Sequence, residues 1–91
     1  MTFAIEYHES VVKVDIPKLS LDQRNRIKSA IEGKLVTAPD IFGKPLRRSL
    51  KGYRKLRVGD YRVVFRIEHR TIKVLVIEHR SRVYIKVRDR L

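Results

Sequence analysis

The sequence predicts one α+β domain, a two-layer sandwich in which helices cover one face of an antiparallel sheet. Three observations lead to this prediction. The chain has 91 residues, which suffices for one hydrophobic core and not for two domains. Its first half contains a capped amphipathic segment, and its second half contains three strand-like segments joined by tight turns.

The N-terminal region is expected to begin with a strand, and the next segment fits either a helix or a strand. In residues 2–8 apolar and aromatic side chains alternate with other residues, as in a strand with one face on the core. Apolar residues in 9–16 fit both a short helix and a strand, so both readings remain open. Pro17 is expected to end either element.

A helix is expected from about residue 21 to residue 35. Ser20 and Gln23 form a capping box, in which the Ser20 hydroxyl accepts from the amide of Gln23. One apolar stripe follows at four-residue spacing, made by Ile27, Ile31 and Leu35. Residues 40–52 read as a basic loop that ends in a turn at Gly52. Two of its residues are expected to pin the loop to the core, Leu46 and Leu50.

Residues 53–58, 61–68 and 71–80 are predicted to form three antiparallel strands, because the connections between them are too short for any other pairing. The third strand is apolar on both faces from Val74 to Ile77, which predicts a central position in the sheet, with a strand on each side. Residues 81–91 are read as a short helix or a strand-like tail.

Alternation along the second strand predicts which residues face the helices, namely Tyr61, Val63, Phe65 and Ile67. Arg62 and Arg66 then point to the opposite face, which we expect to be free for a ligand. Strict alternation along the third strand places one set on a common face, Ile72, Val74, Val76, Glu78 and Arg80. A turn or bulge is needed to bring Arg80 beside Arg62.

Positive charge is concentrated in the second half of the chain, whose formal net charge is +12 overall. Residues 1–43 contain six Lys/Arg and six Asp/Glu, whereas residues 44–91 contain sixteen and four. Solubility alone rarely requires more than about 8 net charges in a small domain. The asymmetry therefore predicts a polyanionic partner, with Lys and Arg on phosphates and Tyr53 or Tyr84 stacked on a base.

Several other classes of function are disfavoured. The chain has no cysteine, and its three histidines are widely spaced without a carboxylate cluster, so neither a thiolate site nor a metal site is expected. We find no signal peptide and no apolar run of about 18 residues, and we therefore expect a cytoplasmic protein with no membrane contact and no cofactor. RNA supplies its own nucleophile, because its 2′-hydroxyl can attack the adjacent phosphorus. A basic sheet face needs only to align that attack, stabilise charge and move two protons.

Three motifs resemble the RelE-type toxins of the RelE/ParE toxin–antitoxin superfamily. The stretch from Lys55 to Phe65 is similar to the family's KLRxGxYR hairpin, and the stretch from Val76 to Tyr84 is similar to its HRxxVY ending. Residues 40–50 resemble its GxPL loop. The resemblance implies one toxin domain over residues 1–91 in the order strand, two helices, meander and C-terminal helix or tail. It also implies ribosome-dependent cleavage of mRNA in the A site, and a cognate acidic antitoxin that covers the basic face.

The resemblance also implies roles for individual residues. Arg62 aligns with the arginine that holds the scissile phosphate, and Arg80 with the arginine that stabilises or protonates the leaving group. Tyr84 aligns with the tyrosine that orients or deprotonates the 2′-hydroxyl, and Lys55 with a catalytic lysine. The general base stays open among Tyr84, Lys55 and His79. The expected RNA contacts are Lys51, Tyr53, Arg54, Arg57, Arg66, His79 and Arg82.

Two other functions remain open on the sequence. ParE-type gyrase inhibitors share the expected fold but generally lack the arginine and tyrosine of the C-terminal stretch, so Arg80 and Tyr84 favour RNA cleavage. A nonenzymatic nucleic-acid-binding module would require only the charge.

Overall fold

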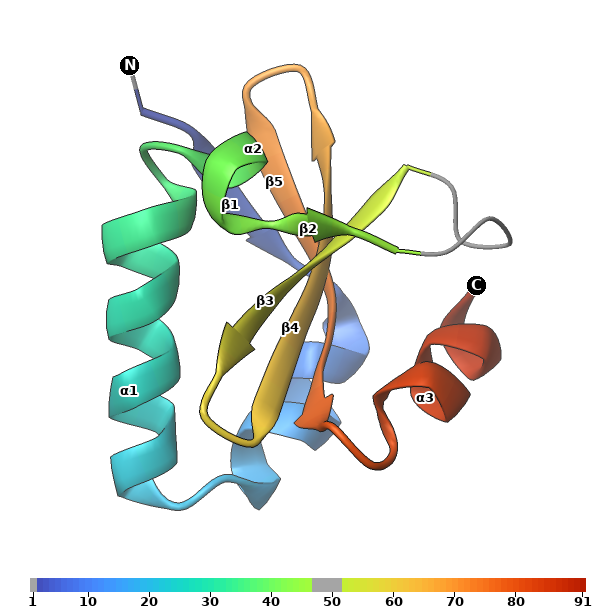
Figure 1. Ribbon diagram of the computed structural model, residues 1–91. Coiled ribbons are helices and arrows are strands. Elements are labelled where there is room, and N and C mark those ends of the chain that lie inside the picture. Colours follow the sequence, from blue (N-terminus) through green and yellow to red (C-terminus); the bar gives the residue numbers. More distant parts are fainter. Residues whose placement is uncertain (1, 47–51) are drawn as a thin grey trace.

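Five strands form one sheet in the order β1-β5-β4-β3-β2 (Figure 1). The computed structural model describes residues 2–46 and 52–91. The strands are β1 (Ala4–Tyr7), β2 (Lys44–Pro45), β3 (Tyr53–Val58), β4 (Tyr61–Glu68) and β5 (Thr71–His79). β1 runs parallel to β5, and the other neighbours are antiparallel. The predicted meander is confirmed, and β5 has the predicted inner position between β1 and β4.

The turns of the meander occur where the sequence places them. Gly59 has φ of 60° in the β3–β4 turn, and Gly52 has φ of 89° before β3. Both values lie in the left-handed region that favours glycine. His69 adopts φ of 56° between β4 and β5, a conformation that non-glycine residues visit uncommonly.

Residues 9–18 are helical, which settles the open choice in the first half of the chain. They include η1 (Val11–Asp15) and η2 (Ile16–Lys18). Pro17 does not end the segment as predicted, because it occupies the first turn of η2, where its missing amide hydrogen is not needed.

The long helix follows as α1 (Leu21–Ala30) and η3 (Ile31–Leu35). At its start the Gln23 amide donates to the Ser20 hydroxyl at 3.1 Å, as the capping box predicts. The predicted stripe of Ile27, Ile31 and Leu35 is buried. It packs with Val63, Phe65 and Ile72 in the main core between the helices and the sheet.

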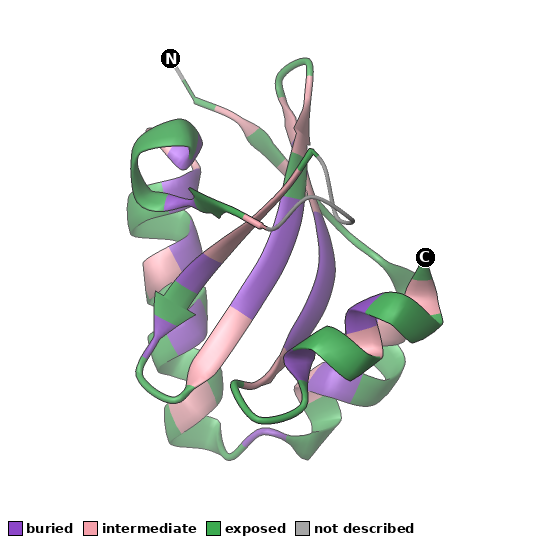
Figure 2. Cartoon of the chain, turned by 45° about the vertical axis from the view of Figure 1, so that its right-hand side comes forward, coloured by how far each residue is buried: buried purple, intermediate pink, exposed green. Residues whose placement is uncertain are grey.

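The opposite face of the sheet is not free, contrary to the sequence-based expectation. The C-terminal segment forms α3 (Val83–Arg90), which lies across this face on the side away from α1 (Figure 1). Val83 and Val87 of α3 pack there in a second cluster with Val64, Leu75 and Val76. Figure 2 shows the buried residues of β4 and β5 between the two helical layers. The sheet face therefore offers a ligand only the part that α3 leaves uncovered.

An irregularity in the β4–β5 ladder corrects the predicted alternation of β5. Val64 pairs with Val76 and Phe65 pairs with Val74, so Leu75 is an extra residue on β5. Ile72 and Val74 face the main core, whereas Val76 lies in the cluster under α3. Beyond the bulge, Glu78 is the partner of Arg62. The bulge thus moves the end of β5 to the face of Arg62, as the approach of Arg80 requires.

The predicted loop at 40–52 contains regular structure that sequence reasoning missed. It includes most of α2 (Pro39–Phe42) and the two-residue edge strand β2, which pairs with β3. Gly43 between them approaches the core so closely that a Cβ would overlap the Phe65 ring and lie 2.8 Å from the Pro39 carbonyl oxygen. Leu46 packs against the second cluster as expected. Leu50 lies outside the described residues.

Candidate functional site

A shallow groove of about 420 Å³ lies where the ends of the sheet strands meet the start of α3. Its lining residues are Lys55, Arg62, His79, Arg80, Ser81, Val83 and Tyr84. All four residues predicted to be catalytic therefore line one groove, together with His79 from the predicted RNA contacts. They come from β3, from β4, from the end of β5 and from α3.

Strand register explains why these side chains share one side of the sheet. Lys55 is the partner of Val64, and Arg57 is the partner of Arg62. Directly paired residues of antiparallel strands point to the same face. Arg62 and Val64 are two apart on β4 and share that face as well. The bulge then adds the end of β5, where Glu78 lies opposite Arg62.

Lys55 and Tyr84 are in direct side-chain contact within the groove. The Lys55 amine donates to the Tyr84 hydroxyl oxygen at 3.0 Å, and the same nitrogen lies 5.7 Å from the centre of the Tyr84 ring. Tyr84 is 42% exposed, whereas Val83 and Val87 of the same helix are buried. Tyr84 is therefore not a core aromatic. Because lysine donates to its oxygen, the Tyr84 hydroxyl hydrogen points to another acceptor.

The two groove arginines keep donors available for an anion. Arg62 donates one guanidinium nitrogen to the carbonyl oxygens of Gly59 and Tyr61, at 3.0 and 2.9 Å. Among the described residues Arg62 forms no ion pair. The Arg80 Nε lies 3.6 Å from Asp60 Oδ1, with both side chains largely exposed. Exposed pairs of this kind contribute little, so a phosphate can compete with Asp60.

Local contacts orient His79 at the rim. The Ser81 amide donates to His79 Nδ1 at 3.2 Å, and the Ser81 hydroxyl oxygen is 2.8 Å from the same atom. A backbone amide is always a donor, so the neutral ring carries its hydrogen on Nε2. The ring also packs edge-on against Tyr61, with 5.7 Å between centroids. His79 thus has both a structural role and a nitrogen left for a ligand.

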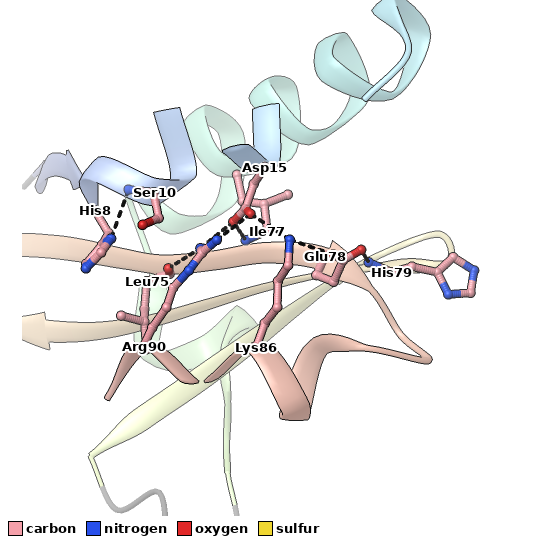
Figure 3. Close-up of polar contacts among 9 residues, drawn as sticks. All are labelled: His8, Ser10, Asp15, Leu75, Ile77, Glu78, His79, Lys86 and Arg90. Atoms are coloured by element: carbon pink, nitrogen blue, oxygen red, sulfur yellow. Dashed lines mark hydrogen bonds and ion pairs between the residues drawn. The ribbon is translucent and has the colours of Figure 1, made fainter. Parts of the chain in front are cut away.

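Behind the groove lies a buried cluster of charges (Figure 3). Asp15 is 2% exposed and accepts four hydrogen bonds, from the Ile77 amide, from Lys86 and from two nitrogens of Arg90. Burial alone would raise the pKa of Asp15, but the hydrogen bonds from Arg90, Ile77 and Lys86 hold that pKa below its ordinary value. Asp15 is therefore a buried carboxylate that stays charged because its partners are in place.

Lys86 joins this cluster to Glu78, whose carboxylate lies 2.8 Å from the Lys86 amine. Burial would raise the pKa of Glu78, yet the hydrogen bonds from Lys86 and the His79 amide lower it. Burial would lower the pKa of Lys86, and its contacts with Glu78 and Asp15 raise it. Glu78 is thus engaged by α3 and not by Arg62, its neighbour in the ladder.

The described ranges contain no group of three His, Asp or Glu side chains that could hold a metal ion. Nor does any helix in the described part of the chain have the length and apolar character needed to cross a membrane. The chemistry available in the groove is that of cations, a phenol and an imidazole.

The sequence profile of one toxin family matches residues 12–84, which is most of the chain. That family is described as the ParE toxin of the type II toxin–antitoxin system parDE. The chain belongs to this toxin family. It is a RelE/ParE-type toxin, as the sequence motifs predicted.

Two named toxins of Mycobacterium tuberculosis (strain ATCC 25618 / H37Rv) are similar to this toxin. Toxin RelG is 44% identical over 54 residues, which are 57% of this chain and 62% of RelG. Toxin RelE is 43% identical over 54 residues, which are 57% of this chain and 56% of that protein. The chain thus spans roughly three fifths of the length of the curated relatives it matches.

Solved structures show the same fold. The toxin resembles a chain of the M. tuberculosis toxin–antitoxin complex RelBE2 with a TM-score of 0.80 and 30% identity, over 87% of this chain and 99% of that one. It also resembles the E. coli toxin RelE bound to an antitoxin peptide, with a TM-score of 0.71 and 22% identity, over 96% and 95% of the two chains. At that identity the second likeness shows the fold alone.

The other predicted RNA contacts that the structure describes do not line the groove. Arg57 is exposed on β3 opposite Arg62, and Arg82 is exposed just before α3. Arg54 instead donates to the Gly43 carbonyl oxygen at 2.9 Å and so supports the connection between α2 and β2. Two of the predicted contacts line a separate hollow at the other end of the strands, Tyr53 and Arg66. Lys51 lies outside the described residues.

Sequence reasoning missed the groove residues Ser81 and Val83, although both lie within the stretch that resembles the family ending. It also missed the role of Asp15, which looked like one polar residue in an ambiguous segment. No local signal could have linked Asp15 to Arg90, because the contact spans 75 positions.

Proposed function

We propose that this toxin is an endoribonuclease that cleaves mRNA in the ribosomal A site, by attack of the 2′-hydroxyl on the adjacent phosphorus and without a metal ion. One observation carries the proposal. The hydrogen-bonded pair Lys55–Tyr84 lies in the same open groove as Arg62 and Arg80. These side chains supply the positioning, charge stabilisation and proton transfer that such a reaction requires.

Each group has a place in the reaction. Arg62 grips the scissile phosphate with the guanidinium donors that Gly59 and Tyr61 leave unused, and stabilises the charge that grows on its oxygens. The pair Lys55–Tyr84 orients the 2′-hydroxyl, whose proton passes to the general base, one of Tyr84, Lys55 and His79, as the new O–P bond forms. Arg80 lies at the departing 5′-oxygen, which gains a proton as its bond to phosphorus breaks.

His79 and Ser81 lie at the rim of the groove, next to Arg80. An imidazole can accept and donate a proton through its ring nitrogens, so His79 is the candidate for proton transfer on the Arg80 side of the groove. The groove is shallow and open, which suits a polymer and gives a single nucleotide few contacts. We infer that the ribosome holds the mRNA in the geometry that the groove cannot impose alone. The toxin would therefore act in the cytoplasm.

The proposal includes a cognate acidic antitoxin. Related chains were solved in complexes titled as toxin–antitoxin complexes, among them RelBE2. The net charge of +12 favours an acidic partner that covers the basic surface and folds on it.

The test is cleavage of mRNA on programmed ribosomes, mapped by primer extension. The wild type is expected to cut within the A-site codon. Arg62→Ala and Arg80→Ala each remove a charge from the groove, and Tyr84→Phe removes the hydroxyl that Lys55 contacts, so each is expected to lower the rate at least 100-fold. Arg88→Ala is the matched control, because Arg88 is exposed on α3 and does not line the groove. Full cleavage by Arg62→Ala and Arg80→Ala would show that the groove is not the site.

A second candidate is inhibition of DNA gyrase, which the ParE description of the matching family favours. Gyrase-dependent DNA cleavage complexes formed by the wild type, without RNA cuts, would favour that function. Binding to RNA that weakens steeply with salt and yields no cut product would indicate a nonenzymatic module.

A further inference from the structure

Tyr84 differs from the other proposed catalytic residues in the type of element that contains it. Lys55 and Arg62 lie on strands of the sheet, and Arg80 directly follows β5. Tyr84 lies on α3, so the position of its hydroxyl depends on how that helix docks. Any residue that fixes the docking of α3 also sets the contact between Tyr84 and Lys55.

Two kinds of contact dock the helix. Val83 and Val87 bury their side chains against Val64, Leu75 and Val76. Apolar contacts select the face of α3 that meets the sheet, but they are non-directional and set the exact placement of the helix less sharply than hydrogen bonds do.

The polar contacts are directional, and most of them converge on Asp15, while Lys86 also contacts Glu78 of β5 at 2.8 Å. Arg90 donates to both carboxylate oxygens of Asp15, at 2.6 and 2.7 Å, and to the Leu75 carbonyl oxygen at 2.9 Å. Lys86 donates to Asp15 at 3.1 Å. Asp15 is itself tied to the sheet by the Ile77 amide at 2.9 Å. Figure 3 shows Lys86 and Arg90 of α3 turned toward Asp15.

The burial of these groups raises the cost of removing any one of them. The Asp15 side chain is fully buried, and the side chains of Arg90 and Lys86 are 10% and 21% exposed. Removing one partner of a buried charge cluster leaves the others desolvated and unpaired, which costs far more than the loss of an exposed pair. Without Asp15, Arg90 would keep only the Leu75 carbonyl oxygen and Lys86 only Glu78, so a docked α3 would hold the Arg90 charge half-satisfied and away from water.

We propose that Asp15 is a positioning residue of the groove. Through Arg90 and Lys86 it holds α3 in the orientation that places the Tyr84 hydroxyl on the Lys55 amine. This inference rests on the proposed function only in assigning Tyr84 a part in RNA cleavage. The docking of α3 by Asp15 can be measured without any RNA.

The first experiment follows Tyr84 directly. The chain has four tyrosines, so the protein labelled with 3-fluorotyrosine gives four ¹⁹F resonances, and Tyr84→Phe assigns one of them. In the wild type the Tyr84 resonance is expected to shift when Lys55→Met removes the contacting amine. In Asp15→Asn it is expected to move toward the position of an exposed tyrosine and to lose its response to Lys55→Met. The resonance of Tyr61, which packs on the main core, is expected to stay.

A control separates docking from general stability. Ile27→Ala weakens the main core on the other side of the sheet and is expected to leave the Tyr84 resonance unchanged below its own melting temperature. If Asp15→Asn does not fold, Arg90→Gln removes the same contact from the end of α3. A Tyr84 resonance that keeps its position and its response to Lys55→Met in the variant that folds would overturn the proposal.

The second experiment uses cleavage on ribosomes. Asp15→Asn is expected to lower kcat by about the same factor as Tyr84→Phe with KM nearly unchanged, because Arg62 and Arg80 do not lie on α3. The double variant is expected to lose no more than Tyr84→Phe alone, whereas independent effects would multiply. Multiplied losses would overturn the proposal. If the wild type cuts no RNA, the proposed function fails, and the ¹⁹F result alone decides the role of Asp15.

Discussion

Asp15 and Glu78 show how the chemistry of single residues depends on partners that are distant in the chain. Both carboxylates lie behind the groove, and both have lowered pKa values although burial acts in the opposite direction. The hydrogen bonds that lower these values come from Lys86 and Arg90 of α3 and from the backbone amides of Ile77 and His79. One consequence is that Glu78 leaves Arg62 free for a phosphate, although Glu78 is the partner of Arg62 in the ladder.

The lowered pKa of Asp15 predicts a loss of stability in acid. A carboxyl whose folded pKa lies below its unfolded value stabilises the fold fully above that unfolded value, near 3.8 for Asp15. The contribution is lost as the pH falls through the folded pKa. We therefore expect the free energy of unfolding in urea to decrease as the pH is lowered from about 5 to below the ordinary aspartate range.

Asp15→Asn provides the control, since its side chain does not titrate. At pH 7 it is expected to be less stable than the wild type by about 3 kcal/mol, the usual cost of breaking a buried ion pair. That difference should shrink in acid, because the wild type then loses the same charge. A difference that stays constant from pH 7 to pH 3 would mean that Asp15 does not contribute through its charge.

At the scale of elements, sequence patterns identified most helices and strands but not how they meet. The capping box at Ser20 and the glycine turn at Gly59 are local signals, and the structure confirms both. The bulge at Leu75 was not visible, because four consecutive apolar residues give no parity to read. The docking of α3 was not visible either, because its charged partner is Asp15 in the first half of the chain.

The same reasoning explains the outcome for the site. Similarity to known motifs indicated Lys55, Arg62, Arg80 and Tyr84, and the structure brings all four to one groove. It could not indicate that Arg54 is engaged by the Gly43 carbonyl oxygen, because the strand β2 beside it contains only two residues and one of them is proline. Short irregular elements leave no periodic signal in a sequence.

The connection between α2 and β2 gives a prediction with an internal control. A Cβ at Gly43 would overlap the Phe65 ring, which is fully buried, so Gly43→Ala is expected to destabilise the fold by about 1–3 kcal/mol. Gly33 lies within η3 and has open space around its Cβ position. Gly33→Ala is expected to stabilise the fold by up to about 1 kcal/mol, since alanine favours helix.

Thermal and urea unfolding of the two glycine variants measure the difference directly. Equal changes in the free energy of unfolding, with the same sign, would show that close packing at Gly43 does not determine the effect of Gly43→Ala. The result also bears on the site, because Gly43 accepts from Arg54 on β3, the strand that contains Lys55.

At the scale of the whole molecule, the positive charge extends over several elements, whereas the proposed reactive side chains lie in one groove. The second half of the chain contains all of the net positive charge, with cations on β3, β4, β5 and α3. The groove uses only a few of them. We therefore expect the surface to provide affinity for the ribosome and RNA, and the groove to provide the reaction.

Salt dependence separates these two contributions. Binding to single-stranded RNA is expected to weaken linearly on a log–log plot against salt, because phosphate contacts release counterions. Arg80→Ala removes one such contact and is expected to lower the slope by about 0.7. Tyr84→Phe removes the hydroxyl and is expected to abolish most cleavage. Because it removes no charge, it is expected to leave the slope unchanged. Cleavage that falls in proportion to affinity in both variants would mean that binding alone limits the reaction and that Tyr84 has no separate part in it.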